Sequence, residues 1–287
     1  MSVGSGGGGP AGPVATVTLP MYDLPEVATA TAAMAEAMAA AVTAAGWAAQ
    51  AAPTAFATHA ELEAHWLDRD VAVTHACGLP LREALAGRVE ALGTFVWRGV
   101  SRPDGWYRSV VVVRAGLAAV DPAQLRGARP AVNHPQSLSG WASLGWALAE
   151  AGLAAGDLAP VVRTGGHVAS LTALADGRAD VASIDGATWA LLSRLRPGLV
   201  AGVRVIGAGP WVPATPLVSP AGGPATPATL RAAVRRAVAD PALAPALDAL
   251  GIEAFVPLAS RDYAVVDAVT ATAERALPRV GTHDLTR

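Results

Sequence analysis

Residues 128–152 read ARPAVNHPQSLSGWASLGWALAEAG and contain a strand, a turn and a helix in succession. The ARPAVN segment predicts a buried strand, and residues 137–152 predict a helix. Ser137, Ser139 and Gly140 are small residues at the expected helix start, where backbone N–H groups are free and the helix dipole is positive. Such a start can bind an anion, but one of the serines can equally be an ordinary N-cap.

The same alternation of strands and helices continues on both sides of this stretch. YRSVVVVRA at 107–115 predicts a central strand because its β-branched run suits a sheet buried on both faces. WVPATPLVSPAGGP, beginning at Trp211, predicts an extended segment that crosses back to the first part of the chain, and 227–277 predicts helices that cover it. We therefore expect an α/β protein with two lobes, formed by 14–103 with 209–287 and by 104–208, after a disordered Gly-rich tail at 1–13.

Composition excludes several classes of protein. The 287 residues carry a formal net charge of −2 and include no lysine, so a nucleic-acid partner is not expected. A single cysteine excludes an internal disulfide and a multi-cysteine metal site, and we expect neither metal nor cofactor. The Ala-rich stretch 28–52 is interrupted by Glu36, Gly46 and Gln50, which predicts an amphipathic helix and not a membrane span.

A second strand-to-helix turn also carries polar groups. Residues 164–170 read TGGHVAS, in which Gly165 and Gly166 allow the backbone to approach a ligand closely. His167 or Ser170 could donate to that ligand, although a histidine at a helix start is often satisfied by the backbone.

Other polar residues stand at the ends of predicted strands. Asp185 lies at the carboxyl end of the strand 180–185, where open α/β sheets bind ligands, or it caps the next helix. Cys77 and His75 could form a nucleophile pair, but the sequence supplies no third group to orient them. The predicted ligand-binding residues are Tyr22, Cys77, Gly78, Tyr107, Ser109, Ser137, Ser139, Gly140, His167, Ser170 and Asp185.

Taken in order, these pieces resemble the phosphate/phosphite/phosphonate substrate-binding family of ABC importers. The family pattern of Tyr-x-Ser, Ser-x-Ser-Gly, Gly-x-His-x-x-Ser and Gly-x-Ala-Asp-x-Ala-x-x-Asp matches residues 107–109, 137–140, 165–170 and 177–185. The resemblance implies a periplasmic-binding-protein type 2 fold with a ligand cleft between two lobes.

The resemblance also implies roles for particular residues. Ser137, Ser139 and Gly140 would hold ligand oxygens together with His167. Tyr22 and Tyr107 would close on the ligand, and Asp185 would contact a protonated oxygen or an amino group. The implied partners are a small oxyanion and an ABC permease, and the chain would act as a monomer and not as an enzyme.

Four alternatives remain at this stage. The ligand could be a thiamine-pyrimidine precursor or a sulfonate, the chain could be a sensing module without a transporter, or it could be a Cys/His enzyme. The family serves in the periplasm, whereas the start MSVGSGGGGPAGP lacks the features of a secretion signal and predicts a cytoplasmic chain.

Overall fold

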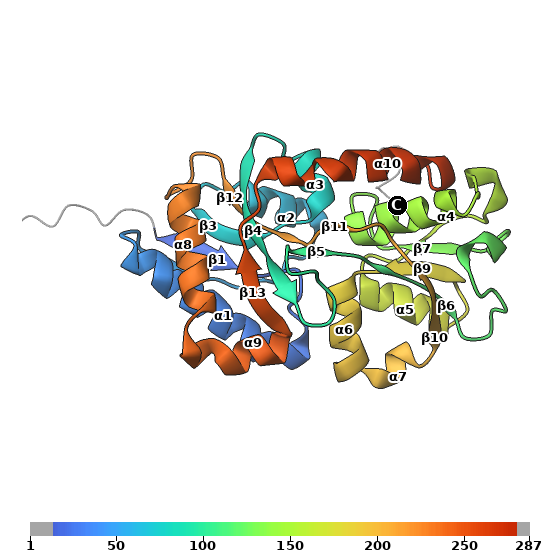
Figure 1. Ribbon diagram of the computed structural model, residues 1–287, viewed down its shortest axis with the longest axis horizontal. Coiled ribbons are helices and arrows are strands. Elements are labelled where there is room, and N and C mark those ends of the chain that lie inside the picture. The colour runs from blue at the N-terminus through green and yellow to red at the C-terminus, as the bar shows by residue number, and fades with distance from the viewer. Residues whose placement is uncertain (1–13, 280–287) are drawn as a thin grey trace, which may run out of the picture.

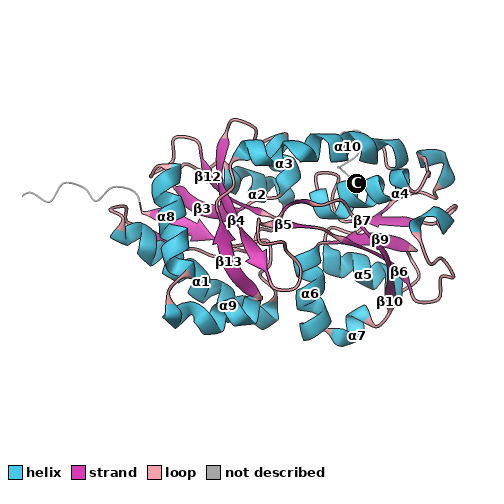
Figure 2. Cartoon of the chain, viewed as in Figure 1, coloured by secondary structure: helices cyan, strands magenta, loops and turns pink. Residues whose placement is uncertain are grey.

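The computed structural model describes residues 14–279 and has two α/β lobes side by side (Figure 1). The tail expected at 1–13, and residues 280–287 of the expected first lobe, lie outside the described residues. Figure 2 shows the strands gathered in the interior of each lobe with helices around them. This mixed architecture is the α/β fold class that the sequence predicts.

The first sheet has the strand order β13-β4-β12-β3-β1-β2. Strand β1 pairs in parallel with β2 and β3, whereas β12 and β13 run antiparallel to β4. The strands are β1 (Ala15–Thr18), β2 (Ala49–Ala51), β3 (Val71–His75), β4 (Val89–Trp97), β12 (Pro216–Pro220) and β13 (Ile252–Val256).

Helices of the first lobe pack on this sheet and on one another. Helix α1 (Ala28–Ala44) contacts α8 (Pro227–Val238) and α9 (Ala244–Leu250). Helix α2 (His59–Trp66) begins after Thr58, whose hydroxyl caps it by accepting the N–H of Glu61 at 3.1 Å. The short helix α3 (Gly78–Arg82) follows β3.

The second sheet has the order β10-β6-β9-β7-β8. Its strands are β6 (Val110–Arg114), β7 (Pro130–Val132), β8 (Val162–Arg163), β9 (Val181–Ile184) and β10 (Val203–Ala208). A π-helical turn (Leu138–Ala142) runs directly into α4 (Ser143–Glu150), and the other helices are α5 (His167–Ala175), α6 (Gly186–Leu195) and α7 (Pro197–Val200). The strand, turn and helix expected within 128–152, and the strand-to-helix turn expected at 164–170, are therefore present.

Two antiparallel segments connect the lobes. Strand β5 (Trp106–Tyr107) pairs with β11 (Val212–Pro213), and Figure 1 places this pair between the two sheets. The proline-rich segment does more than cross, because it continues into β12 inside the first sheet. Its prolines are tolerated there because Pro216 and Pro220 stand at the two ends of the strand.

The last helix departs from the expected arrangement. Helix α10 (Val265–Ala276) packs along α4 of the second lobe, while α8 and α9 pack on the first. A Cβ atom at Gly145 would lie 2.8 Å from the Cβ of Ala273, so the two helices approach closely only because both residues are small. The indole N–H of Trp141 also donates to the carbonyl of Leu277 at 3.0 Å. The expectation that the C-terminal helices all cover the first sheet is therefore wrong for α10.

One segment, Pro25–Ala44, has the length and apolar composition of a membrane-spanning helix. In this fold it lies against α8 and α9 and against the first sheet, and half of its most apolar window is buried. The packing accounts for its apolar composition as that of a core helix.

A buried carboxylate joins three strands of the second lobe. Asp180 is 7% exposed, and its oxygens accept from the Arg114 Nε at 2.8 Å and from the Arg129 Nε at 2.9 Å. It also accepts the backbone N–H of Arg129. Hydrogen bonds from Arg129, followed by those from Arg114, hold the pKa of Asp180 well below its usual range.

We predict that Asp180→Asn lowers the free energy of unfolding by about 2 kcal/mol, because two guanidinium groups lose a charged acceptor. Since the folded-state pKa is lowered, the stabilisation is full above the unfolded pKa of ~3.9 and is lost as the pH falls further. Urea denaturation at neutral pH measures the change. The exposed pair Asp176–Arg178 supplies the control Asp176→Asn, for which we expect a change within about 0.5 kcal/mol. Equal effects in the two variants would contradict this account.

Candidate functional site

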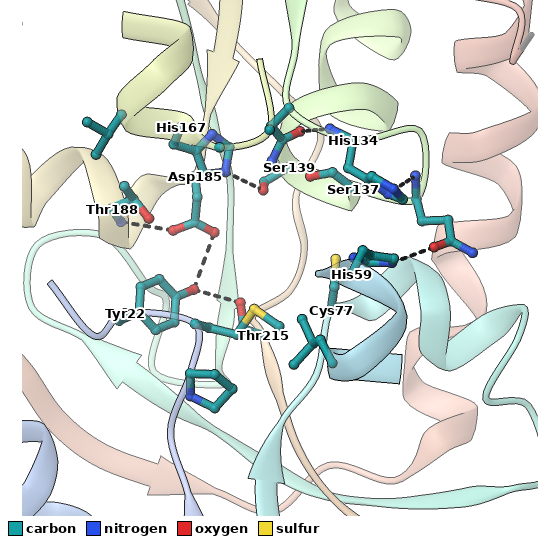
Figure 3. A pocket seen from close by; sticks show the side chains of 18 of the residues that line it. Tyr22, His59, Cys77, His134, Ser137, Ser139, His167, Asp185, Thr188 and Thr215 are labelled. Atoms are coloured by element: carbon teal, nitrogen blue, oxygen red, sulfur yellow. Dashed lines mark hydrogen bonds between the residues drawn. The ribbon is translucent and has the colours of Figure 1, made fainter. Parts of the chain in front are cut away.

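A cavity of about 400 Å³ lies between the lobes, and Figure 3 shows the side chains that converge on it. Its walls come largely from the segments that follow β1, β3, β7, β8 and β9, which is where open α/β sheets bind ligands. The polar residues that line it are Tyr22, His59, Cys77, Tyr107, Asn133, His134, Gln136, Ser137, Ser139, His167, Asp185, Thr188 and Thr215.

Asp185 is the centre of a hydrogen-bond network on one side of the cavity. Its Oδ2 accepts the hydroxyl of Tyr107 at 2.7 Å and that of Tyr22 at 3.3 Å. Its Oδ1 accepts the backbone N–H of Thr188 at 2.9 Å, which caps α6. The Tyr22 hydroxyl also lies 2.6 Å from the Thr215 hydroxyl. The carboxylate therefore ties the first lobe and the crossing strand β5 to the start of a second-lobe helix.

The two tyrosines are hydrogen-bond donors over the whole neutral pH range. Burial, and next the nearby charge of Asp185, raise the pKa of both Tyr22 and Tyr107 well above its ordinary value. Their protons are therefore available to the carboxylate, and the network needs no change of ionisation to form.

The opposite side of the cavity is the start of the helix that leads into α4. Ser137 is the N-cap, and its hydroxyl oxygen accepts the N–H of Gly140 at 2.9 Å. The N–H of Leu138 points to the Cys77 sulfur at 3.4 Å. The N–H of Ser139, in the same first turn, stands at a position that has no partner four residues earlier in the helix.

Gly140 must be small because the Asn133 side chain packs against this helix start. A Cβ atom there would lie 1.8 Å from the Oδ1 of Asn133, so only glycine lets the Asn133 side chain lie against the turn. Asn133 in turn lines the cavity, whereas Gly140 does not.

His167 reaches the same helix start from the first turn of α5. Its Nε2 lies 2.9 Å from the hydroxyl oxygen of Ser139 (Figure 3). Burial lowers the pKa of His167, while the charge of Asp185 acts in the opposite direction. The ring is therefore a neutral donor or acceptor at neutral pH, and not a fixed cation.

A third contact crosses the cavity at its other end. The Nε2 of His59, on α2, lies 2.6 Å from the Oε1 of Gln136, and the His59 ring stacks on His134 with centroids 3.9 Å apart. The backbone N–H of Gln136 donates to the Nδ1 of His134 at 3.2 Å, which places the proton of a neutral ring on Nε2. Burial, and next the neighbouring His59 and Arg163, lower the pKa of His134 to about 4.

Cys77 and His75 do not form an activated nucleophile pair. Burial raises the pKa of the Cys77 thiol and lowers that of His75 to about 3. At neutral pH both groups are therefore uncharged, whereas cysteine catalysis requires a thiolate. The ring of His75 packs edge-on against the rings of Tyr22 and Phe95, so its surroundings are those of an aromatic core residue.

The structure brings most of the sequence-predicted ligand residues to one cavity. Those that line it are Tyr22, Cys77, Tyr107, Ser137, Ser139, His167 and Asp185. Four others do not: Gly78 packs under Leu138, Gly140 under Asn133, Ser109 lies beside Ser143, and Ser170 bonds Thr164 at 2.6 Å. These four support the walls and do not face the cavity.

The predicted set lacks six of the polar residues that line the cavity: His59, Asn133, His134, Gln136, Thr188 and Thr215. His134 directly follows the strand β7, so the rule that ligands bind at strand ends could have indicated it. His59 lies on a helix far away in the sequence, and no local pattern indicates that it meets His134.

The electrostatic character of the cavity is unusual for an anion site. In the described part of the chain, no arginine lines the cavity, and Asp185 is its one carboxylate. Residues 14–279 also contain no group of three His, Cys, Asp or Glu side chains that could hold a metal ion. Uncharged donors and helix starts are therefore the groups that this site offers to a ligand.

A family model described as "ABC transporter, phosphonate, periplasmic substrate-binding protein" matches residues 17–263. A search of curated protein sequences found no significant match.

Three similar solved structures share the fold at low identity. PhnD1 of Prochlorococcus marinus, in complex with methylphosphonate, has a TM-score of 0.74 and 14% identity, covering 92% of this chain and 99% of its own. A binding component of an ABC phosphonate transporter of Pseudomonas aeruginosa has a TM-score of 0.69 and 16% identity, covering 91% of this chain and 87% of its own. A chloride-bound protein of Xanthomonas citri has a TM-score of 0.68 and 18% identity, covering 91% of this chain and 98% of its own.

Proposed function

The chain belongs to the family of periplasmic substrate-binding proteins of phosphonate ABC transporters, and we propose that it binds a phosphorus oxyanion between its lobes, at the helix start that follows Ser137. Members of this family bind small ligands for transport with an ABC permease. The family is one of transport proteins and not of enzymes. The proposal extends to delivery of the ligand to such a permease.

The observation that carries the proposal is the meeting of two helix starts in one cavity. Ser139 and His167 come from different βα turns, yet their side chains lie 2.9 Å apart on its wall. Both turns direct backbone N–H groups and the positive ends of helix dipoles toward the same region. A tetrahedral anion there would receive the N–H of Ser139, the hydroxyl of Ser137 and the one proton that the hydrogen-bonded pair of the Ser139 hydroxyl and the His167 ring has left to donate.

Asp185 has a different task in this proposal from the one implied by the resemblance. Its oxygens already accept from two tyrosines and one backbone N–H. We assign it to holding the lobes together around the ligand. A protonated phosphonate could still donate to a remaining lone pair of this carboxylate, but an ammonium group would compete with the tyrosine hydroxyls.

The neutral state of Cys77 and His75 supports binding without covalent catalysis. The Cys77 sulfur accepts the N–H of Leu138, which places the thiol beside the proposed anion-binding turn. We assign the chain no reaction of its own.

We predict that methylphosphonate raises the melting temperature of the protein by mass action. Ser139→Ala should weaken methylphosphonate binding by about 1–3 kcal/mol, because a hydrogen bond to a charged group is lost. Isothermal titration calorimetry measures the change. Ser193→Ala, an exposed serine on α6, is the matched control and should leave the affinity unchanged.

Methanesulfonate should be titrated in parallel, since it has the same tetrahedral shape and a single charge. If the protein binds methanesulfonate and not methylphosphonate, the proposed ligand would be a sulfonate instead of a phosphonate. An unchanged methylphosphonate affinity in Ser139→Ala would refute the assigned pocket.

We also predict that binding does not depend on a charged His167. Burial lowers the pKa of this ring below its ordinary value of ~6.5, so the ring is neutral above about pH 7, and neither helix dipoles nor hydroxyls titrate in this range. Above about pH 7 the affinity should follow the ionisation of the ligand alone, and His167→Gln should show the same pH profile. A steep loss of affinity with rising pH that disappears in His167→Gln would instead make His167 a cationic partner of the anion.

A further inference from the structure

The two lobes touch each other around the cavity. Arg196, after α6, forms a bidentate ion pair with Glu26 of the first lobe, at 2.6 and 3.0 Å. His59 reaches Gln136 at 2.6 Å, and Tyr22 reaches Asp185 at 3.3 Å. The volume of about 400 Å³ is therefore that of a cleft whose rims are in contact.

This volume is too large for the smallest phosphorus oxyanions. At about 30 Å³ for each water-sized group, methylphosphonate would fill roughly a third of it. Pockets of about 300–1,000 Å³ are typical for organic ligands many times larger than a phosphate ion. The remaining space would have to hold either water or more of the ligand.

The remaining wall is largely apolar. Seven apolar side chains line the cavity, from the segment after β1 and from helices α2, α5 and α6: Pro20, Met21, Leu24, Leu62, Trp66, Val168 and Leu191. Ordered water there would find few polar partners, whereas a hydrocarbon group would gain about 0.8 kcal/mol for each buried methylene.

The charges of the cavity exclude one common kind of organic substituent. Asp185 is the one carboxylate on the wall formed by the described residues, and Tyr22, Tyr107 and the Thr188 N–H already occupy it. A ligand ammonium group would therefore have to compete with three existing donors for this carboxylate, and a buried charge that is incompletely paired is costly.

From these observations we infer that the ligand is a phosphonate with a bulky, uncharged alkyl or aryl substituent. Its oxygens lie at the Ser139 helix start, and its substituent lies against Leu62 and the other apolar residues of the wall. This inference rests on the proposed function, since it assumes that the anion binds at that helix start.

A ligand series tests the inference on the unmodified protein. Methylphosphonate, aminoethylphosphonate, phenylphosphonate and benzylphosphonate carry the same anion on different substituents. By calorimetry we expect benzylphosphonate to bind at least about tenfold more tightly than methylphosphonate. The burial of an aromatic ring can supply more free energy than this tenfold gain requires. Aminoethylphosphonate should bind no more tightly than methylphosphonate.

A cavity-filling variant locates the substituent. His59, Leu62 and Trp66 share the cavity-facing side of α2, so Leu62→Trp should occupy the apolar space. It should reduce benzylphosphonate affinity about tenfold while changing methylphosphonate affinity less than about threefold. Ala64→Trp places the same side chain on an exposed position of α2 and should retain the preference.

The outcomes separate this inference from the function beneath it. Methylphosphonate binding as tightly as benzylphosphonate would overturn the inference and leave the proposed function intact. A preference for benzylphosphonate that survives Leu62→Trp would overturn the assigned location of the substituent. If no phosphorus oxyanion binds to the folded protein, the proposed function and the inference both fail.

Discussion

The carboxylate of Asp185 is the interaction on which the arrangement of the cleft depends. A buried carboxylate requires donors, and here they come from three separate parts of the chain: Tyr22, Tyr107 and the start of α6. Because the tyrosines are protonated at neutral pH, these bonds persist without any ligand. The pair β5–β11 brings Tyr107 to the carboxylate.

The separation of charge within the cleft has a chemical consequence. The carboxylate is placed among hydroxyls on one side, while the Ser139 helix start and the hydrogen-bonded Ser139–His167 pair present uncharged groups on the other. An anion can be held there by dipoles in surroundings of low dielectric constant, without the desolvation of an arginine. Such a site offers no full positive charge to its ligand, and in our proposal the apolar part of the wall distinguishes between ligands.

The sequence predicted the local features and missed the distant ones. The turns at 137–140 and 165–170 were identifiable because a strand, small polar residues and a helix follow one another directly. The contact of His59 with His134 depends on how the two lobes meet. Helix α10 lies on α4 because Gly145 permits a close approach. No local sequence pattern indicates either contact. The prolines of 211–224 indicated an extended segment, but only the pairing of β12 with β3 and β4 places it inside a sheet.

A crystal structure of the protein with methylphosphonate bound tests the central claim most directly, because it locates the oxygens themselves. The account predicts that they lie within hydrogen-bonding distance of the Ser139 N–H and hydroxyl and of the His167 ring, with Tyr22 and Tyr107 still bonded to Asp185. An anion bound outside this cavity, or one held by arginine side chains, would contradict it.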